Sequence, residues 1–275
     1  MLLGLIGNPV SMSWSDMLFN TIFRLEDSEN LYLSANVAPE TVPSVLNIKL
    51  CPFDAFNVTA PYKETVLLSI PDRMPAVWKI GSANLVVKNR ESFLAHNTDY
   101  YGFLETLRKN HVSLDGKDIA ICGTGGVART ALYSILTECS PQSIHILSRN
   151  PATALKRFSG TSMFSGIKVQ GYDDESDFDV IVNCTSLGMK RDDSSPVERD
   201  RFRKGSVAID LTYQNPVTEL MRNATGKGGR GINGREMFFS QAMETYRIVF
   251  GQYPEKEIFR KAEEVVIEWA EKRSP

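Results

Sequence analysis

The sequence has few of the residues that bind metals or form disulfides. Among its 275 residues are only four cysteines and three histidines. No two cysteines are spaced as C-x-x-C, no H-E-x-x-H motif occurs, and the spacings fit no zinc pattern. Cys122 and Cys184 follow apolar runs, so we expect buried free thiols, which are typical of a reducing compartment. The sequence therefore predicts no metal site.

Long apolar runs and an excess of charge of one sign are also missing. No stretch of about 18 apolar residues is present, and residues 1–9 lack the basic start of a signal peptide. The formal net charge is −2, so no basic field attracts nucleic acid or anionic lipid. We therefore expect a cytoplasmic protein with no nucleic-acid or membrane partner. The oligomeric state stays open, with a homodimer as the candidate assembly.

Short apolar runs alternate with helical patterns along the first hundred residues, which favours a mainly parallel sheet covered by helices. Ser15 is expected to cap the first helix. We expect strands over 2–6, 31–37 and 55–58, helices over 15–25, 39–48 and from about Pro61, and a hairpin of strands 84–87 and 93–95.

A second βαβ set begins near residue 118. We expect strands over 118–122, 143–147, 180–183 and 207–211, helices over 100–110, 127–137, 235–250 and 255–272, surface loops at 172–177 and 190–204, and a flexible connection at 226–231. The predicted fold class is α/β with two domains and a central cleft. Residues 1–100 plus 235–275 would form an α/β substrate-binding and catalytic domain, and residues 101–234 a Rossmann-like dinucleotide-binding domain.

The glycine-rich segment after residue 122 is the strongest sign of a cofactor. A strand runs into Gly123, Thr124, Gly125, Gly126 and Val127, and a helix follows. Glycines let a backbone turn tightly beside a pyrophosphate, and the helix N-terminus offers free N–H groups and a partial positive charge. The alternative is a tight strand–helix turn without a ligand.

The residues after the next strand bear on which nicotinamide cofactor is bound. NAD-binding proteins usually place an acidic residue there, whereas NADP-binding proteins place an arginine against the 2′-phosphate. This sequence has Ser148, Arg149 and Asn150 and no acid nearby, so we predict NADP. The alternative is an exposed loop arginine.

Two further segments of the first hundred residues carry polar side chains after strands. Lys63 would lie in the first turn of the helix beginning at Pro61, where the helix dipole disfavours a positive charge. Asp99 would lie at the N-terminus of the next helix, where an anion is stabilised. Taken singly, Lys63 fits a solvated surface lysine, and Asp99 fits a helix cap.

Read together and in order, these segments resemble the shikimate dehydrogenase family over nearly the whole chain. The matching segments are Asn57–Glu64 (N-V-T-x-P-x-K), Asn97–Gly102 (N-T-D-x-x-G), Gly123–Ala128 (G-x-G-G-x-A), Asn183–Met189 (N-x-T-x-x-G-M), Asp210–Tyr213 and Gly234–Gln241. Gly81–Asn84 is similar to the family's G-A-x-N segment. The sequence departs from the family pattern at Asp16, Phe19 and Thr153, where the family has proline, histidine and often a basic residue. Lys156 or Arg157 is a candidate to replace that basic residue.

The resemblance implies an enzyme that reduces 3-dehydroshikimate to shikimate with NADPH in chorismate and aromatic amino-acid biosynthesis. Lys63 and Asp99 would be the catalytic pair, with Lys63 supplying the proton to the ketone oxygen and Asp99 positioning it. Residues binding shikimate would be Ser13, Ser15, Thr59, Asn84, Asp99, Tyr213 and Gln241. Residues binding NADP would be Gly123, Thr124, Gly125, Gly126, Val127, Ser148, Arg149, Asn150, Thr185, Leu211 and Gly234. The alternatives are a quinate/shikimate dehydrogenase with relaxed substrate and NAD use, and a non-catalytic dinucleotide-binding sensor.

Overall fold

A computed structural model describes residues 1–158, 164 and 166–273. The chain divides into two compact units, one formed by residues 1–101 and 241–275 and the other by residues 102–240. Two helices, α4 (Asp99–Lys109) and α8 (Arg235–Phe250), each contain one of the boundaries between these units. None of the described helices is both long enough and apolar enough to cross a membrane.

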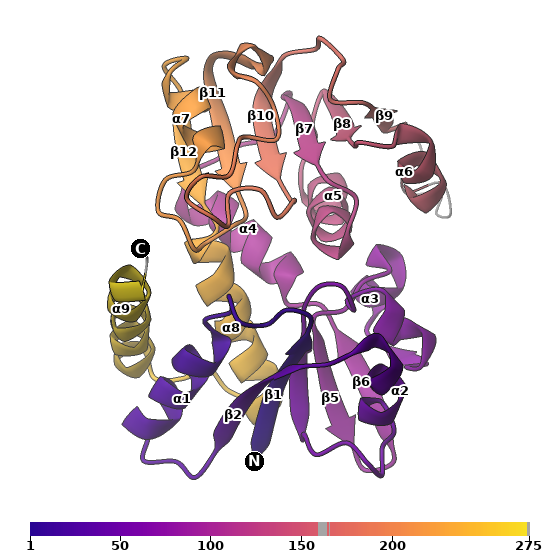
Figure 1. The fold of residues 1–275 in the computed structure, drawn as a ribbon, viewed down its shortest axis with the longest axis vertical. Helices are drawn as coiled ribbons and strands as arrows, with labels where there is room; N and C mark the ends of the chain where they lie inside the picture. Colours follow the sequence, from indigo (N-terminus) through magenta and orange to yellow (C-terminus); the bar gives the residue numbers. More distant parts are fainter. Residues whose placement is uncertain (159–163, 165, 274–275) are drawn as a thin grey trace. The chain divides into compact units, whose positions relative to one another are not determined.

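The first unit is built on a six-stranded sheet with the order β2-β1-β3-β5-β6-β4 (Figure 1). Besides parts of α4 and α8, the strands and helices of this unit are β1 (Leu2–Gly7), α1 (Ser15–Leu25), β2 (Leu31–Asn36), η1 (Pro39–Thr41), α2 (Val42–Val45), β3 (Ala55–Val58), η2 (Thr65–Leu68), β4 (Asp72–Arg73), α3 (Pro75–Ile80), β5 (Leu85–Asn89), β6 (Ser92–His96) and α9 (Lys256–Arg273). Phe56 on β3 and Val86 on β5 are fully buried in the core on one face of this sheet.

The sheet is mixed but mainly parallel, as predicted, since only β5 runs against the other strands. β1 is parallel to β2 and to β3, whereas β5 is antiparallel to β3 and to β6. The predicted hairpin is confirmed, and its insertion beside β3 reverses the direction of β5. Two reversals make β6 run the same way as β3. The ends of β1, β3 and β6 and the start of β5 therefore lie at one edge of the sheet.

Three local predictions in this unit are wrong. No α-helix begins at Pro61, because the backbone carbonyl of Lys63 accepts the N–H of Ala83 at 2.8 Å instead of a helical partner, and only the 3₁₀ turn η2 follows. The helix expected over 39–48 is shortened to η1 and α2. Trp14 occupies the N-cap position of α1 without a side-chain capping hydrogen bond, and Ser15 is the first helical residue.

The second unit contains a six-stranded, fully parallel sheet with the order β12-β11-β10-β7-β8-β9. Besides parts of α4 and α8, the strands and helices of this unit are β7 (Asp118–Cys122), α5 (Gly126–Glu138), β8 (Ser143–Leu147), α6 (Pro151–Phe158), β9 (Lys168–Gln170), β10 (Phe178–Asn183), η4 (Arg199–Arg201), β11 (Phe202–Asp210), α7 (Glu219–Thr225) and β12 (Arg230–Asn233). After β7 the chain adds β8 and β9 toward one edge of the sheet, and after β10 it adds β11 and β12 toward the other edge. This is the doubly wound strand order of dinucleotide-binding domains.

Apolar residues of β7 pack on both faces of this sheet, which explains its unbroken hydrophobic run. Ile119 and Ile121 join the core on one face, and Ala120 and Cys122 join the core on the other.

Two surface predictions are wrong in part. β11 begins at Phe202 inside the stretch expected to be a loop, and residues 230–231 belong to β12 rather than to a flexible connection.

Candidate active site

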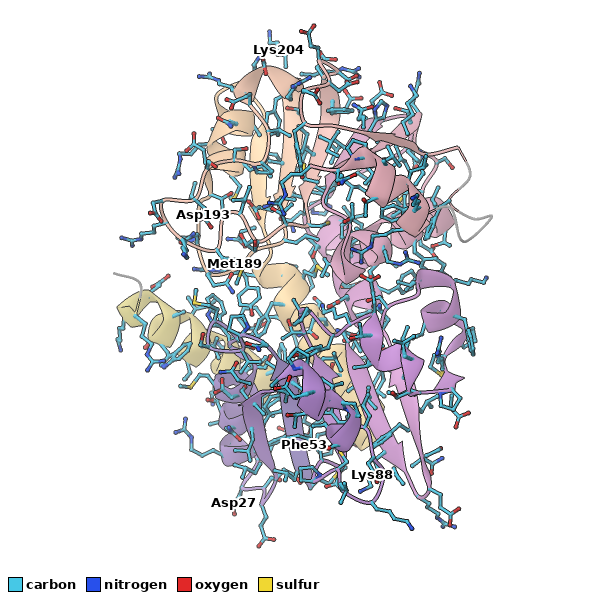
Figure 2. All side chains as sticks on the ribbon, turned by 45° about the vertical axis from the view of Figure 1, so that its right-hand side comes forward. Asp27, Phe53, Lys88, Met189, Asp193 and Lys204 are labelled. Carbon is cyan, nitrogen blue, oxygen red and sulfur yellow. The ribbon has the colours of Figure 1, made fainter. Side chains whose placement is uncertain are left out.

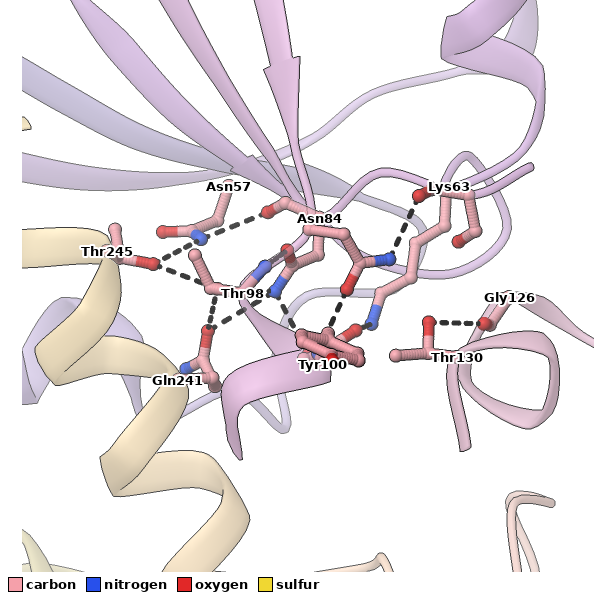
Figure 3. A network of polar contacts seen from close by, with 12 residues as sticks. Asn57, Lys63, Asn84, Thr98, Tyr100, Gly126, Thr130, Gln241 and Thr245 are labelled. Atoms are coloured by element: carbon pink, nitrogen blue, oxygen red, sulfur yellow. Dashed lines mark hydrogen bonds and ion pairs between the residues drawn. The ribbon is translucent and has the colours of Figure 1, made fainter. Parts of the chain in front are cut away.

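The first unit brings Lys63 and Asp99 into direct contact, although they are 36 residues apart in the chain. The Lys63 Nζ atom lies 2.6 Å from Asp99 Oδ2, and only 15% and 8% of the two side chains are exposed (Figure 3). Lys63 follows β3 and Asp99 follows β6, two strands that end at the same edge of the sheet. An ammonium and a carboxylate at this distance form a charge-assisted hydrogen bond that can hold a proton donor in place.

Asn84 holds the other oxygen of Asp99. Its Nδ2 atom donates to Asp99 Oδ1 at 3.0 Å and to Thr98 Oγ1 at 2.9 Å. Its Oδ1 atom accepts the backbone N–H of Thr98 at 2.6 Å. Both carboxylate oxygens of Asp99 are therefore engaged by separate donors, which fixes the plane of the carboxylate and, through it, the Lys63 ammonium.

A buried polar network continues from Asn84 into α8 (Figure 3). Gln241 Oε1 accepts from Thr98 Oγ1 at 3.3 Å and from Asn84 Nδ2 at 3.4 Å. Thr245 Oγ1 lies 3.2 Å from Thr98 Oγ1 and accepts from Asn57 Nδ2 at 3.4 Å. The sequence reasoning did not assign Asn57 and Thr245. The four-residue spacing that puts Thr245 on the same helix face as Gln241 was the available signal.

Ser13, Ser15 and Thr59 lie beside the same edge of the sheet. Ser13 Oγ donates to Ser15 Oγ at 3.1 Å and accepts the N–H of Ser15 at 3.2 Å, so the two serines form one hydroxyl pair after β1. Thr59 directly follows β3, and its backbone N–H donates to the Ile6 carbonyl at 2.9 Å. Their hydroxyls are suited to bind a hydroxylated ligand. Tyr213 belongs to the second unit, where its ring packs on Phe238 with centroids 4.7 Å apart.

The second unit carries the glycine-rich loop between β7 and α5. Gly123 has φ +109°, and a Cβ there would lie 3.2 Å from the Cys184 carbonyl oxygen, so this position requires glycine. A Cβ on Gly125 would meet no atom within 4 Å. Gly126 is the first residue of α5, and no side chain caps this helix end, so its first N–H groups have no partner within the helix. Thr124, Gly126 and Val127 thus form a turn at a helix N-terminus, which fits a pyrophosphate.

The open space at Gly125 allows a test of cofactor binding that leaves the fold intact. We expect Gly125→Ala to raise the KM for NADP by about tenfold or more, because the methyl group would take space that the pyrophosphate needs, a loss of about 1.4 kcal/mol. The backbone of Gly125 (φ −81°, ψ −175°) is open to alanine, so the melting temperature should change little. Gly123→Ala should instead unfold more easily. Unchanged NADP kinetics in Gly125→Ala would contradict the assignment.

Ser148, Arg149 and Asn150 follow β8, the sheet neighbour of β7. Asn150 Oδ1 accepts the Thr153 N–H at 3.0 Å and thereby begins α6, while Ser148 Oγ accepts the Asn150 N–H at 3.2 Å. The Arg149 side chain is exposed. Two of the three residues thus also shape the turn, and Arg149 has the charge and the exposure to meet a phosphate.

The remaining predicted cofactor residues lie on loops at the carboxyl ends of β10, β11 and β12. Thr185 donates both its N–H and its hydroxyl to Asn183 Oδ1, at 2.9 and 2.7 Å. Leu211 follows β11 and is partly buried. Gly234 follows β12, and a Cβ there would lie 2.3 Å from the Leu211 carbonyl oxygen, so the two loops pack backbone to backbone.

His96 precedes the Asn97–Asp99 turn and should make stability depend on pH. Burial lowers its pKa from 6.5, and Arg247 acts in the same direction while Glu244 opposes it. Below pH 6.5 the unfolded chain binds a proton that the folded protein does not, so stability falls as the pH falls through this window. As the pH is lowered from 7.5 toward the pKa of His96 in the folded protein, we expect the melting temperature of His96→Gln to fall less than that of the parent. Parallel curves for the two proteins would contradict this.

A doubly wound parallel sheet with a glycine-rich turn, together with a buried lysine–aspartate pair, defines an α/β dehydrogenase that uses a dinucleotide. A family model described as the shikimate dehydrogenase substrate binding domain matches residues 5–86. A shikimate dehydrogenase (NADP(+)) from Thermoplasma acidophilum is 34% identical over 260 residues, which is 94% of each chain. The chain belongs to the shikimate dehydrogenase family.

Solved structures of the family have the same fold. The shikimate dehydrogenase of Thermotoga maritima is 27% identical, with a TM-score of 0.81 over 97% of this chain and 100% of that one. A shikimate dehydrogenase in complex with NADP+ is 25% identical, with a TM-score of 0.86 over 98% of this chain and 95% of that one. These likenesses confirm the predicted α/β class with a Rossmann-like part.

Proposed function

We propose that the protein catalyses the reversible, NADPH-dependent reduction of 3-dehydroshikimate to shikimate, a step of chorismate and aromatic amino-acid biosynthesis. The observation that carries this proposal is the 2.6 Å contact of Lys63 with Asp99 at the sheet edge where Asn84, Thr59 and the Ser13–Ser15 pair also lie. The curated relative in Thermoplasma acidophilum is named for this activity. All four cysteines are free, which supports a reducing, cytoplasmic location.

Reduction of a ketone requires a hydride on carbon and a proton on oxygen. The nicotinamide supplies the hydride when it is bound. Lys63 gives a proton from its ammonium to the carbonyl oxygen, and in the reverse direction its amine accepts the hydroxyl proton. Asp99 keeps Nζ aimed at that oxygen, and Asn84 keeps Asp99 in place. The low exposure of the pair strengthens the polarisation of the carbonyl.

The substrate has hydroxyl groups and a carboxylate, which require several polar partners. In the first unit we assign this role to the Ser13–Ser15 hydroxyl pair, Thr59, Asn84 and Gln241. Gln241 Oε1 accepts from Thr98, and we assign the amide nitrogen of Gln241, a donor, to an oxygen of the substrate. Tyr213, in the second unit, stays a predicted substrate-binding residue.

Arg149 should set the preference for NADP over NAD. We expect Arg149→Ala to raise the KM for NADP by about 10- to 100-fold, because a charge-assisted bond to the 2′-phosphate contributes about 1.5–3 kcal/mol. The KM for NAD, which lacks that phosphate, should stay nearly constant. Steady-state kinetics with both cofactors measure this, with Lys204→Ala, which removes an exposed lysine near the start of β11, as a control. An equal effect on both cofactors would argue against phosphate recognition.

The proposed function is tested by absorbance at the reduced-nicotinamide band in four mixtures, with shikimate or quinate and with NADP or NAD. We expect rapid reduction only with shikimate and NADP. Comparable rates with quinate and NAD would instead indicate a quinate/shikimate dehydrogenase. No reduction in any mixture, despite NADP binding, would indicate a non-catalytic sensor.

A further inference from the structure

Asp210 is a buried carboxylate in the second unit that the proposed proton transfer does not use. It is the last residue of β11, is 1% exposed, and lies in register with Asn183, the last residue of β10. Its Oδ1 atom accepts from Asn183 Nδ2 at 3.0 Å and from the N–H and the hydroxyl of Thr212 at 3.1 and 2.9 Å. Its Oδ2 atom accepts from Thr218 Oγ1 at 2.7 Å. All four contacting groups are donors; burial raises the pKa of Asp210, and these hydrogen bonds oppose that effect because they favour the ionised carboxylate.

Asn183 extends this network into the loop after β10. Its Nδ2 atom also donates to the Leu187 carbonyl at 2.7 Å, and its Oδ1 atom accepts both donors of Thr185. The amide has two hydrogens and two acceptor sites, and every one of them is used. The conformation of residues 184–187 therefore depends on the orientation of Asn183, which Asp210 fixes.

Gly188 brings the same loop against the carboxylate. It has φ +99°, and a Cβ there would lie 3.2 Å from Asp210 Oδ2 and 3.1 Å from Thr212 Oγ1. Its carbonyl accepts a hydrogen bond from Asn215 Nδ2, which comes from the loop after β11. Its N–H donates to Asp193 Oδ2 at 3.0 Å, within the loop where Figure 2 labels Met189 and Asp193. One carboxylate thus fastens two loops to each other.

We propose that Asp210 is a positioning residue of the reaction, whose carboxylate holds the loops after β10 and β11 in the arrangement that cofactor and substrate require. The proposal rests on the function proposed above, because these loops carry Thr185, Leu211 and Tyr213. Asp210 acts through them and does not itself touch the ligands. A misplacement of about 1 Å is enough to cost about 100-fold in rate.

The test is Asp210→Asn, which keeps the side-chain shape but replaces one oxygen acceptor with an NH₂ donor. That NH₂ group would face either Thr218 or the pair Asn183 and Thr212, which are donors themselves. We expect kcat for shikimate oxidation to fall about 10- to 100-fold while the KM values change less. Trypsin should cut after the exposed Lys190 or Arg191 about fivefold faster or more, because the loop opens more readily.

Asp118→Asn is the matched control. Asp118 begins β7 in the same sheet and pairs with Arg203 at 2.7 Å, so its loss weakens the sheet away from the two loops. We expect a lower melting temperature with unchanged kcat and unchanged cleavage of the loop. Equal losses of kcat in both variants would overturn the proposal, because stability would then explain the effect.

Two further outcomes separate this inference from the proposed function. A parent protein that does not oxidise shikimate, but whose Asp210→Asn variant shows faster cleavage after Lys190 or Arg191, would refute the proposed function and support the role of Asp210 in holding the loop. An active parent whose Asp210→Asn variant keeps kcat within about twofold would overturn the inference and leave the proposed function standing.

Discussion

Lys63→Ala should lose about 10²- to 10⁴-fold in kcat, the usual contribution of a positioned general acid or base. The KM for shikimate should change little, because several other polar groups of the first unit remain to hold the substrate. Removal of the ammonium takes away the group that polarises the carbonyl and delivers the proton. Steady-state kinetics in both directions measure this effect.

Lys88→Ala is the control for the general effect of removing a lysine from this sheet. Lys88 lies on β5, and its Nζ atom donates to the Cys51 carbonyl at 3.2 Å. It should retain the kinetic constants of the parent. If Lys63→Ala lost affinity and turnover to the same extent, Lys63 would be a binding residue and not part of the chemical step.

Asp99→Asn should lower kcat by about 10²-fold or more, because the amide cannot satisfy both of its neighbours. Asp99 now accepts from Lys63 with one oxygen and from Asn84 with the other. In either orientation, an asparagine would direct its NH₂ group at one of these donors. Lys63 would lose its position or Asn84 would turn away.

The control for this substitution is Asp54→Asn, because Asp54 accepts the Leu2 N–H at 2.8 Å just before β3 and lies away from Lys63. It should keep full activity. Circular dichroism and thermal unfolding of both variants show whether each is folded. A folded Asp99→Asn variant with normal kcat would show that the carboxylate is not needed to hold Lys63.

The strands of the parallel sheet could be predicted because their residues are buried on both faces. β7 and β8 were located with their observed bounds, since apolar runs of this length followed by glycine or polar turns leave few alternatives. β9 and β12 were missed. They are short strands at the two edges of the sheet and carry lysine, glutamine, arginine and asparagine. Their pairing depends on neighbouring strands that local patterns do not reveal.

The site shows the same limit. The pairing of Lys63 with Asp99 could be predicted only from the family resemblance, because nothing in their local sequence indicates a contact between residues 36 positions apart. The helix predicted at Pro61 failed because a distant N–H, that of Ala83, takes the carbonyl of Lys63. Asn57 and Thr245 are 188 positions apart and make their hydrogen bond only in the folded unit. Tertiary hydrogen bonds thus decided what local propensity could not.

A crystal structure of the protein with bound shikimate tests the central claim most directly. We expect Lys63 Nζ and an Asp99 carboxylate oxygen both to lie within about 2.6–3.2 Å of one ring hydroxyl, the one that is oxidised to the ketone. Shikimate bound with that hydroxyl away from both groups, or bound only at another part of the chain, would contradict it.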